Sequence, residues 1–183
     1  MTFQRALTAL AVTASLTACS GGARRPAPPS GHPVQQHLSN LPERLVAMHN
    51  RERAAVGAPP LAWDASLASA ADAYGPALAR LGRLEHSPAG SRAGQGENLW
   101  MGTAGAYRLE EMFGAWAEEK RLLRAGAFPN VSTSGRWQHV AHYTQIIWRS
   151  TARVGCAVHR DGRWDYLICR YSPAGNVFGQ RVP

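Results

Sequence analysis

The sequence of 183 residues is poor in cysteine and contains no long hydrophobic run. One of its three cysteines, Cys19, follows the N-terminal apolar stretch, and the two that remain are too few for a structural zinc site. The apolar stretch at residues 6–16 has 11 residues, whereas a membrane-spanning helix needs about 20. These two shortages exclude a cysteine-based zinc domain and a polytopic membrane protein.

Lysine is the scarcest charged residue, with one lysine against 19 arginines. The formal net charge is +8, but the arginines are scattered along the chain. A nucleic-acid surface needs clustered positive charge, so we expect no nucleic-acid partner. Apolar residues make up 45% and charged residues 17% of the sequence, which fits one compact domain with a tail. We expect this domain to be a monomer.

Residues 1–18 have the features of a lipoprotein signal peptide. A short positive segment ending at Arg5 precedes the apolar stretch. The sequence Leu16-Thr17-Ala18-Cys19 then resembles the bacterial lipobox, in which the cysteine is acylated and becomes the first residue of the mature chain. Ordinary secretion with a chance cysteine is the alternative.

Acylation of Cys19 would make the lipid bilayer a partner of this protein, since acyl chains bury in membranes. Ser20, rather than aspartate, follows the cysteine, which favours the outer membrane in an organism that has one. We therefore expect an exported lipoprotein at the outer membrane or cell surface.

The mature chain is predicted to consist of a tether and one domain. Residues 19–40 are rich in proline and glycine and show no apolar period. Proline-rich segments run extended at about 3.1 Å per residue, so this segment would hold the domain away from the membrane. The domain is expected at residues 41–183.

Three helices are expected in the first two thirds of the domain. The first begins near Leu41 after Ser39 or Asn40 and ends before Gly57. The second begins after Asp64, a good N-cap, and ends near Gly82. The segment 84–107 is rich in glycine and serine and is predicted to be a long functional loop.

The third helix is expected at residues 108–123, where apolar residues recur at helical spacing. At 100° per residue, Glu118 faces water, whereas Glu119 lies at the edge of the buried face. Glu119 is therefore either part of a salt bridge or a functional carboxylate.

The last third of the sequence changes to short segments rich in β-branched and aromatic residues, at residues 145–148, 153–160 and 165–171. These segments predict an antiparallel sheet, so the fold class is α+β. Cys156 and Cys169 each share strand parity with apolar neighbours. A four-residue loop at 161–164 would place them opposite each other, whereas a two-residue Asp-Gly turn would pair Leu167 with Cys156. With Cys19 acylated and the chain exported, these two cysteines are expected to form a disulfide, which favours the longer loop.

Several separate motifs occur in an order that resembles the CAP superfamily, also called the SCP domain, of cysteine-rich secretory proteins, antigen 5 and pathogenesis-related proteins. The motifs cover residues 43–179. They are His49-Asn50 with Arg53, Pro60-Leu61-Ala62-Trp63, His86-Ser87, Gly96-Glu97-Asn98-Leu99, His142-Tyr143-Thr144-Gln145-Ile146-Ile147-Trp148, Val154-Gly155-Cys156-Ala157 and Tyr166-Leu167-Ile168-Cys169-Arg170-Tyr171-Ser172-Pro173-Ala174-Gly175-Asn176.

The resemblance implies a three-layer α-β-α sandwich with a central antiparallel sheet and a cleft containing two histidines and two glutamates. Matched motif by motif, this tetrad is His86, Glu97, Glu119 and His142. Imidazole and carboxylate groups are good ligands for Zn²⁺ or another divalent cation. In similar proteins the two histidines hold the ion, so His86 and His142 are the expected metal ligands, and a structural His–Glu network is the alternative.

Three functions fit these features. The resemblance favours a binding module whose cleft takes an ion and a small apolar, lipid or peptide ligand. A non-catalytic scaffold or host-interaction protein displayed by its anchor is the second. A metal-dependent hydrolase of peptide or cell-wall material is the third, with Glu97 or Glu119 as general base. A serine triad fits less well, because Ser87 directly follows His86 and no Gly-x-Ser-x-Gly motif is present.

The lipid anchor leads to a direct prediction. Replacing Cys19 by serine removes the thiol that would carry the acyl group, so the Cys19→Ser protein should leave the membrane fraction and appear in the soluble one. Cell fractionation followed by immunoblotting measures this. Membrane association equal to that of the unmutated chain would show that Cys19 is not the anchor.

Overall fold

The computed structural model describes residues 38–92 and 94–183. The signal peptide, Cys19 and most of the tether lie outside the described residues. The helices are α2 (Leu41–Ala55), α3 (Ala65–Leu81), α4 (Leu109–Ala117) and α5 (Ala141–Ile147), with 3-10 turns η1 (Ala89–Arg92), η2 (Glu118–Leu122) and η3 (Trp137–His139). The strands are β1 (Ala62–Trp63), β2 (Gly96–Thr103), β3 (Gly126–Ala127), β4 (Arg153–Arg160), β5 (Trp164–Ser172) and β6 (Arg181–Val182).

The main sheet has the strand order β1-β4-β5-β2. Its three long strands, β4, β5 and β2, are antiparallel, and the short β1 adds a parallel edge next to β4. A separate pair is formed by β3 and β6. The expected α+β class is confirmed, with a sheet that is mixed rather than purely antiparallel, and β2 forms the edge opposite β1.

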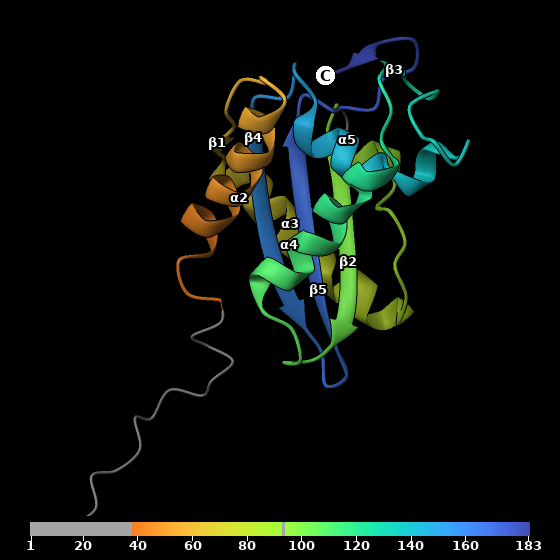
Figure 1. The fold of residues 1–183 in the computed structure, drawn as a ribbon. Helices are drawn as coiled ribbons and strands as arrows, with labels where there is room; N and C mark the ends of the chain where they lie inside the picture. The colour runs from red at the N-terminus through yellow and green to blue at the C-terminus, as the bar shows by residue number, and fades with distance from the viewer. Residues whose placement is uncertain (1–37, 93) are drawn as a thin grey trace, which may run out of the picture. The chain divides into compact units, whose positions relative to one another are not determined.

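The sheet lies between two helical layers (Figure 1). Helix α3 covers one face and packs on β4 and β5, with Ala71, Leu78 and Ile168 in its core. Helices α2, α4 and α5 cover the other face, where the larger core lies. The three-layer sandwich is therefore confirmed. Within the described residues, the search for a helix long and apolar enough to cross a membrane finds none.

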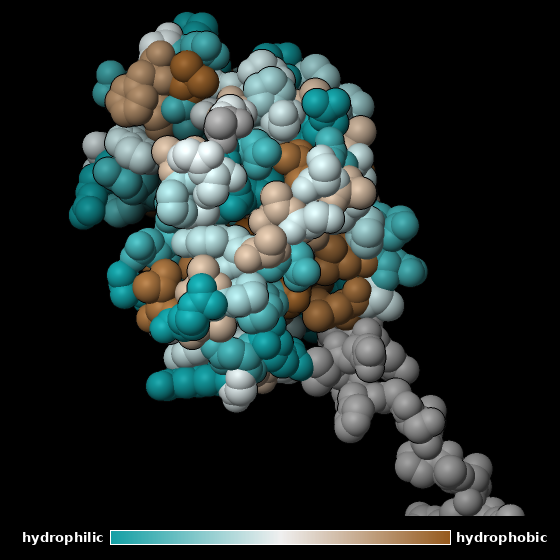
Figure 2. All heavy atoms as spheres, turned by 180° about the vertical axis from the view of Figure 1, so that it is seen from behind, coloured by the Kyte–Doolittle hydropathy of each residue, from teal (hydrophilic) through white to brown (hydrophobic). Residues whose placement is uncertain are grey.

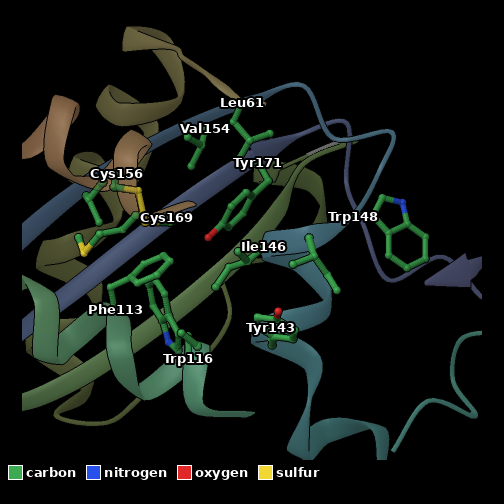
Figure 3. Packing of buried hydrophobic residues seen from close by; sticks show 14 of the residues in the cluster. Leu61, Phe113, Trp116, Tyr143, Ile146, Trp148, Val154, Cys156, Cys169 and Tyr171 are labelled. Carbon is green, nitrogen blue, oxygen red and sulfur yellow. A yellow bond between two sulfur atoms is a disulfide. The ribbon is translucent and has the colours of Figure 1, made fainter. Parts of the chain in front are cut away.

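Aromatic residues from α4, α5 and β5 meet in the larger core (Figure 3). Phe113 and Trp116 project from α4 toward Tyr171 of β5, and Ile146 and Tyr143 come from α5. All five side chains are buried. This core joins the short helices α4 and α5 to the sheet, so it positions the residues that those helices carry.

Two predicted segments have a different structure. Residues 96–103, placed in a long loop, form β2, which pairs with β5 from Gly96 opposite Tyr171 to Thr103 opposite Trp164. Residues 145–148, predicted as a strand, belong largely to α5. In both cases tertiary pairing or packing overrides the local pattern. The third helix also changes at Ala117, where the α-helix becomes the 3-10 turn η2 that carries Glu119.

Other local predictions are confirmed. The Asp64 carboxylate accepts hydrogen bonds from the backbone N–H groups of Ser66 and Leu67 and so caps α3. Gly82 ends the same helix with a φ of 62°, a conformation that glycine adopts without steric cost. At the start of α2, by contrast, Asn40 makes no side-chain capping bond.

The hairpin between β4 and β5 has the longer of the two loops considered. Arg160 pairs with Asp165, so residues 161–164 connect the strands, and Cys156 lies opposite Cys169. The two cysteines form a disulfide, with their Cα atoms 4.1 Å apart. The loop length thus sets the register that permits the bridge.

Helix α3 approaches β4 very closely at Gly155. A Cβ atom at this position would lie 2.3 Å from both the Ala68 nitrogen and the Asp64 carbonyl oxygen. These are backbone atoms of the first turn of α3, which cannot move without shifting the helix. Gly155 therefore sets the distance between the α3 layer and the sheet.

We predict that Gly155→Ala lowers the free energy of unfolding by about 1–3 kcal/mol, because the added methyl group overpacks this contact. Gly162→Ala is a matched control, since a Cβ there meets nothing within 4 Å, and it should change stability by less than about 0.5 kcal/mol. Urea denaturation measures both. Equal effects of the two substitutions would contradict the close contact.

Candidate functional site

The sequence-predicted tetrad forms two His–Glu pairs. In the first pair, Nδ1 of His86 lies 2.7 Å from Oε1 of Glu97. Ser87 adds two further hydrogen bonds to the same carboxylate, from its backbone nitrogen to Oε1 and from its hydroxyl to Oε2, each 3.0 Å long. Arg170 forms an ion pair with Glu97, with Nε 3.0 Å from Oε2. The loop that follows α3 is thereby fastened to strand β2.

Glu97 is buried, but its surroundings favour the charged form. Burial opposes ionisation, yet the hydrogen bond from His86, the charge of Arg170 and the two bonds from Ser87 together hold the pKa of Glu97 below its usual value. The carboxylate is therefore ionised at neutral pH. It accepts a hydrogen bond from Nδ1 of His86, which carries the proton.

In the second pair, Nδ1 of His142 lies 2.6 Å from Oε1 of Glu119. The other oxygen, Oε2, accepts hydrogen bonds from the backbone nitrogens of His142 and Tyr143, at 3.0 and 3.1 Å. These are the first N–H groups of α5, which no bond within the helix can satisfy. Glu119 thus positions the His142 ring and caps the helix that carries it.

Arg53 of α2 holds the other end of α5. Its fully buried guanidinium donates to the carbonyl oxygens of Ile146 and Trp148 at 2.8 Å each, and to Thr151 at 2.9 Å. A fourth bond goes to Pro59 at 2.5 Å. Burial lowers the pKa of Arg53 to about 10, which leaves it charged at neutral pH.

The two carboxylates also determine which nitrogen of each imidazole is available. An ionised carboxylate only accepts hydrogen bonds, so Nδ1 of His86 and of His142 carries the proton in the neutral ring. The lone pair is then on Nε2, which is the nitrogen offered to a ligand. The His86 side chain is 56% exposed and the His142 side chain 31%, so both rings are accessible.

Strand β2 connects the two pairs through neighbouring residues. Glu97 lies opposite Arg170 and Asn98 opposite Cys169, and successive residues of a strand point to opposite faces. Glu97 is on the α3 face, while Nδ2 of Asn98 donates to the His142 carbonyl oxygen at 3.1 Å. The two pairs are therefore joined through adjacent residues of β2, with Glu97 of the first pair on one face and the contact to His142 on the other.

A buried chain of hydrogen bonds connects Asn98 to helix α2 through Tyr171. Nδ1 of His49 lies 2.8 Å from the Leu45 carbonyl oxygen, so this nitrogen carries the proton. Nε2 of His49 then accepts from the Tyr171 hydroxyl at 2.9 Å, and the Tyr171 oxygen accepts from Nδ2 of Asn98 at 3.2 Å. Every hydrogen in this chain has one allowed place, and the role of His49 is structural.

Across residues 38–92 and 94–183, no three His, Cys, Asp or Glu side chains gather into a metal-binding group. Two histidines with one available nitrogen each are therefore what this region offers to a cation. Both glutamates are engaged by hydrogen-bond donors, so their role is to orient the rings.

The family model of CAP, the cysteine-rich secretory protein family, matches residues 46–171 of this chain. The chain belongs to this family. Among curated proteins it is 34% identical over 153 residues to the pathogenesis-related protein PRMS of Zea mays, an alignment that covers 82% of this chain and 86% of the relative. It is 36% identical to a PR-1 type protein of Sambucus nigra, with 78% and 81% covered.

Solved CAP-like structures show the same fold at low sequence identity. The structure of NaASP2 with Zn²⁺ aligns with a TM-score of 0.65 and 24% identity, covering 76% of this chain and 83% of that one. BmVAL-1 aligns with a TM-score of 0.63 and 22% identity, covering 91% and 86%. At this identity the likeness establishes the CAP architecture alone.

Sequence reasoning named His86, Glu97, Glu119 and His142 as one tetrad through the motif match, with helical phasing also favouring Glu119, but it did not foresee their division into two pairs. It did not foresee the roles of Arg53, Asn98, Arg170 and Tyr171, which are buried polar residues within the matched motifs. Their residue types could have indicated these roles. A charged or amide side chain inside an apolar strand or helix needs a hydrogen-bonding partner when it is buried.

The cap on α5 gives a prediction for Glu119. The Glu119→Gln substitution keeps the size but removes the charge that the helix N-terminus and His142 favour, so we expect stability to fall by about 1–3 kcal/mol. Glu118→Gln is the neighbouring control, because Glu118 is exposed, and it should cost less than about 0.5 kcal/mol. Thermal denaturation distinguishes them. Indistinguishable melting curves for the two variants would contradict the capping role.

The buried His49 predicts a pH dependence of stability. Burial lowers its pKa from 6.5 to about 4, so between these values the unfolded chain takes up a proton that the folded protein does not. The free energy of unfolding should therefore fall as pH drops from about 6.5 to 4, with His49 contributing on the order of 3 kcal/mol. Urea denaturation at several pH values across this range gives the free energy of unfolding as a function of pH. This free energy should depend less steeply on pH in His49→Gln than in the unmutated protein. An unchanged slope would mean that His49 is not the titrating group.

Proposed function

We propose that this chain is an extracytoplasmic CAP-domain lipoprotein, anchored by acylated Cys19, that binds a divalent cation through His86 and His142. The observation that carries the proposal is the pairing of each Nδ1 with a glutamate, which leaves both Nε2 lone pairs for a ligand. The same arrangement, with a carboxylate behind each imidazole, is usual for histidines that ligate metals.

Zinc is the cation that this donor set suits best, since neutral imidazole is among its preferred ligands. Water or a bound molecule would complete the coordination, because the two glutamates already accept other hydrogen bonds. The existence of a related fold solved with Zn²⁺, NaASP2, is consistent with this choice. A bound cation would supply a Lewis acid at the β2 edge.

The engaged carboxylates favour binding over hydrolysis. A general base needs a free oxygen close to the water that it activates. Both oxygens of Glu97 accept bonds from His86 or Ser87, and both oxygens of Glu119 accept bonds from His142 or its neighbour. The Ser87 hydroxyl donates its hydrogen bond to Glu97 and not to a histidine, which also argues against Ser87 as a nucleophile. A binding module is therefore preferred over a hydrolase, and the zinc titration below separates it from a scaffold.

Calorimetric titration with ZnCl₂ at pH 7.5 tests the proposal. The unmutated protein should bind zinc, and zinc should raise its melting temperature because the site exists only in the folded chain. Binding should weaken as pH falls, since protons compete with the metal for imidazole nitrogen.

The His86→Ala/His142→Ala double variant should fold and lose the zinc response. His159→Ala is the control, because His159 lies on β4 beside Tyr166 and pairs with neither glutamate. This variant should bind zinc as the unmutated protein does. No heat of binding to the unmutated protein, or equal binding by the double variant, would leave the His–Glu pairs with a structural role alone.

A further inference from the structure

A second polar centre lies on the α3 side of the sheet, which faces the viewer in Figure 2. A pocket of about 270 Å³ opens there between α3, η1 and β5, lined by Ala70, Ala73, Tyr74, Ser91 and Arg170. On this side the hydrophobic residues appear as separate groups among hydrophilic ones (Figure 2). The pocket thus combines apolar walls from one helix with a cationic residue from the sheet.

Arg170 is 2% exposed, and its charge is only partly satisfied. Nε lies 3.0 Å from Oε2 of Glu97, but that carboxylate also serves His86 and Ser87. Among the described residues, neither Nε nor Nη1 of Arg170 has a hydrogen-bond partner of good geometry. Within the same described residues, one other buried side-chain atom lacks a hydrogen-bond partner. It is Oε1 of Gln95, the residue directly before β2.

A buried donor without an acceptor is unfavourable because its lost hydration is not replaced, and native proteins contain few of them. Here the buried side-chain atoms without a partner, among the described residues, belong to two residues around the pairing of β2 with β5. Of these two, only Arg170 lines the pocket. Its two unsatisfied nitrogens are donors that lack an acceptor, whereas Oε1 of Gln95 is itself an acceptor and is not relevant to an anion. Because the guanidinium is a planar cation with several donors, the partner that fits it is a carboxylate or a similar planar anion.

The walls of the pocket specify the rest of the ligand. Ala70 and Ala73 present methyl groups, and the Tyr74 ring lies against the guanidinium, with the Arg170 Cζ 5.9 Å from the ring centroid. The Tyr74 hydroxyl points away to the Glu85 carbonyl oxygen at 2.8 Å. The volume is slightly below that of typical ligand pockets, so a compact apolar body fits and a long chain does not.

We propose that this pocket binds a small organic carboxylate, with the carboxylate on Arg170 and a compact apolar group against Ala70, Ala73 and Tyr74. The site is distinct from the His86 and His142 nitrogens and does not depend on a metal. Glu97 contacts both centres, so it is the residue through which they are connected.

Benzoate and benzamide are suitable probes, because they share one shape and differ in charge. In buffer with EDTA, which removes any contribution from a metal, titration calorimetry should show saturable binding of benzoate at least ten-fold tighter than that of benzamide. Inorganic phosphate, an anion without an apolar body, should also bind at least ten-fold more weakly. Equal binding of benzoate and benzamide, or no binding of benzoate, would overturn the proposal, and phosphate binding as tightly as benzoate would overturn the part that concerns the apolar walls.

Two variants locate the binding. Arg170→Met should abolish the preference for benzoate, although it also leaves Glu97 without its ion pair and can impair folding. Ala73→Leu avoids this difficulty, because Ala73 is an exposed position of α3 and leucine there fills the pocket. It should weaken benzoate binding at least ten-fold, whereas Ala65→Leu, on the same helix outside the pocket, should not. Unchanged affinity in Ala73→Leu would place the carboxylate elsewhere and contradict the proposal.

Discussion

A seven-residue helix held by opposite charges at its two ends is the feature on which the candidate site depends. Helix α5 is too short to be stable alone. Glu119 binds the N–H groups at its start, and Arg53 binds the carbonyl groups at and beyond its end. Both charges have the sign that the helix dipole favours. Because His142 is the second residue of α5, these contacts determine where its imidazole lies.

The edge strand β2 organises the other half of the site. Glu97 and Asn98 are neighbours, so strand alternation sends one to the α3 face and the other toward α5. Gly96 permits a close approach of α5, since a Cβ there would lie 2.0 Å from Oε1 of Gln145. The same Gln145 oxygen accepts a hydrogen bond from the Gly175 nitrogen at 2.9 Å. Three of the motifs that mark the family therefore meet in one place and hold one another.

This arrangement supports the proposed role in binding rather than a role in proton transfer. Each glutamate has both oxygens occupied and acts on a histidine ring and on a backbone segment at once. Such groups keep the geometry of the histidine rings constant, because most of their acceptor sites are already used by donors of the chain itself. Arg170 differs from them, because it is buried beside a pocket with donors that the chain itself does not satisfy. Glu97 contacts both His86 and Arg170, so it is common to the His86–Glu97 pair and to the pocket that Arg170 lines.

Local and register-based features could be predicted from the sequence. Asp64 as a cap and Gly82 as a stop follow from short-range stereochemistry, which neighbouring residues decide. The four-residue hairpin followed instead from the disulfide expected between Cys156 and Cys169, since the local Asp-Gly signal also allowed a shorter turn. The motifs identified the family and, through it, the four residues of the tetrad, whose division into two His–Glu pairs appears only in the structure. By contrast, the sequence pattern placed β2 in a loop and residues 145–148 in a strand. Gly96-Glu97-Asn98 becomes a strand because β5 offers it backbone partners, and the apolar β-branched run in α5 becomes helical because Glu119 and Arg53 satisfy its ends. Those partners lie between 23 and 95 residues away in the chain, so only the tertiary structure could decide these segments.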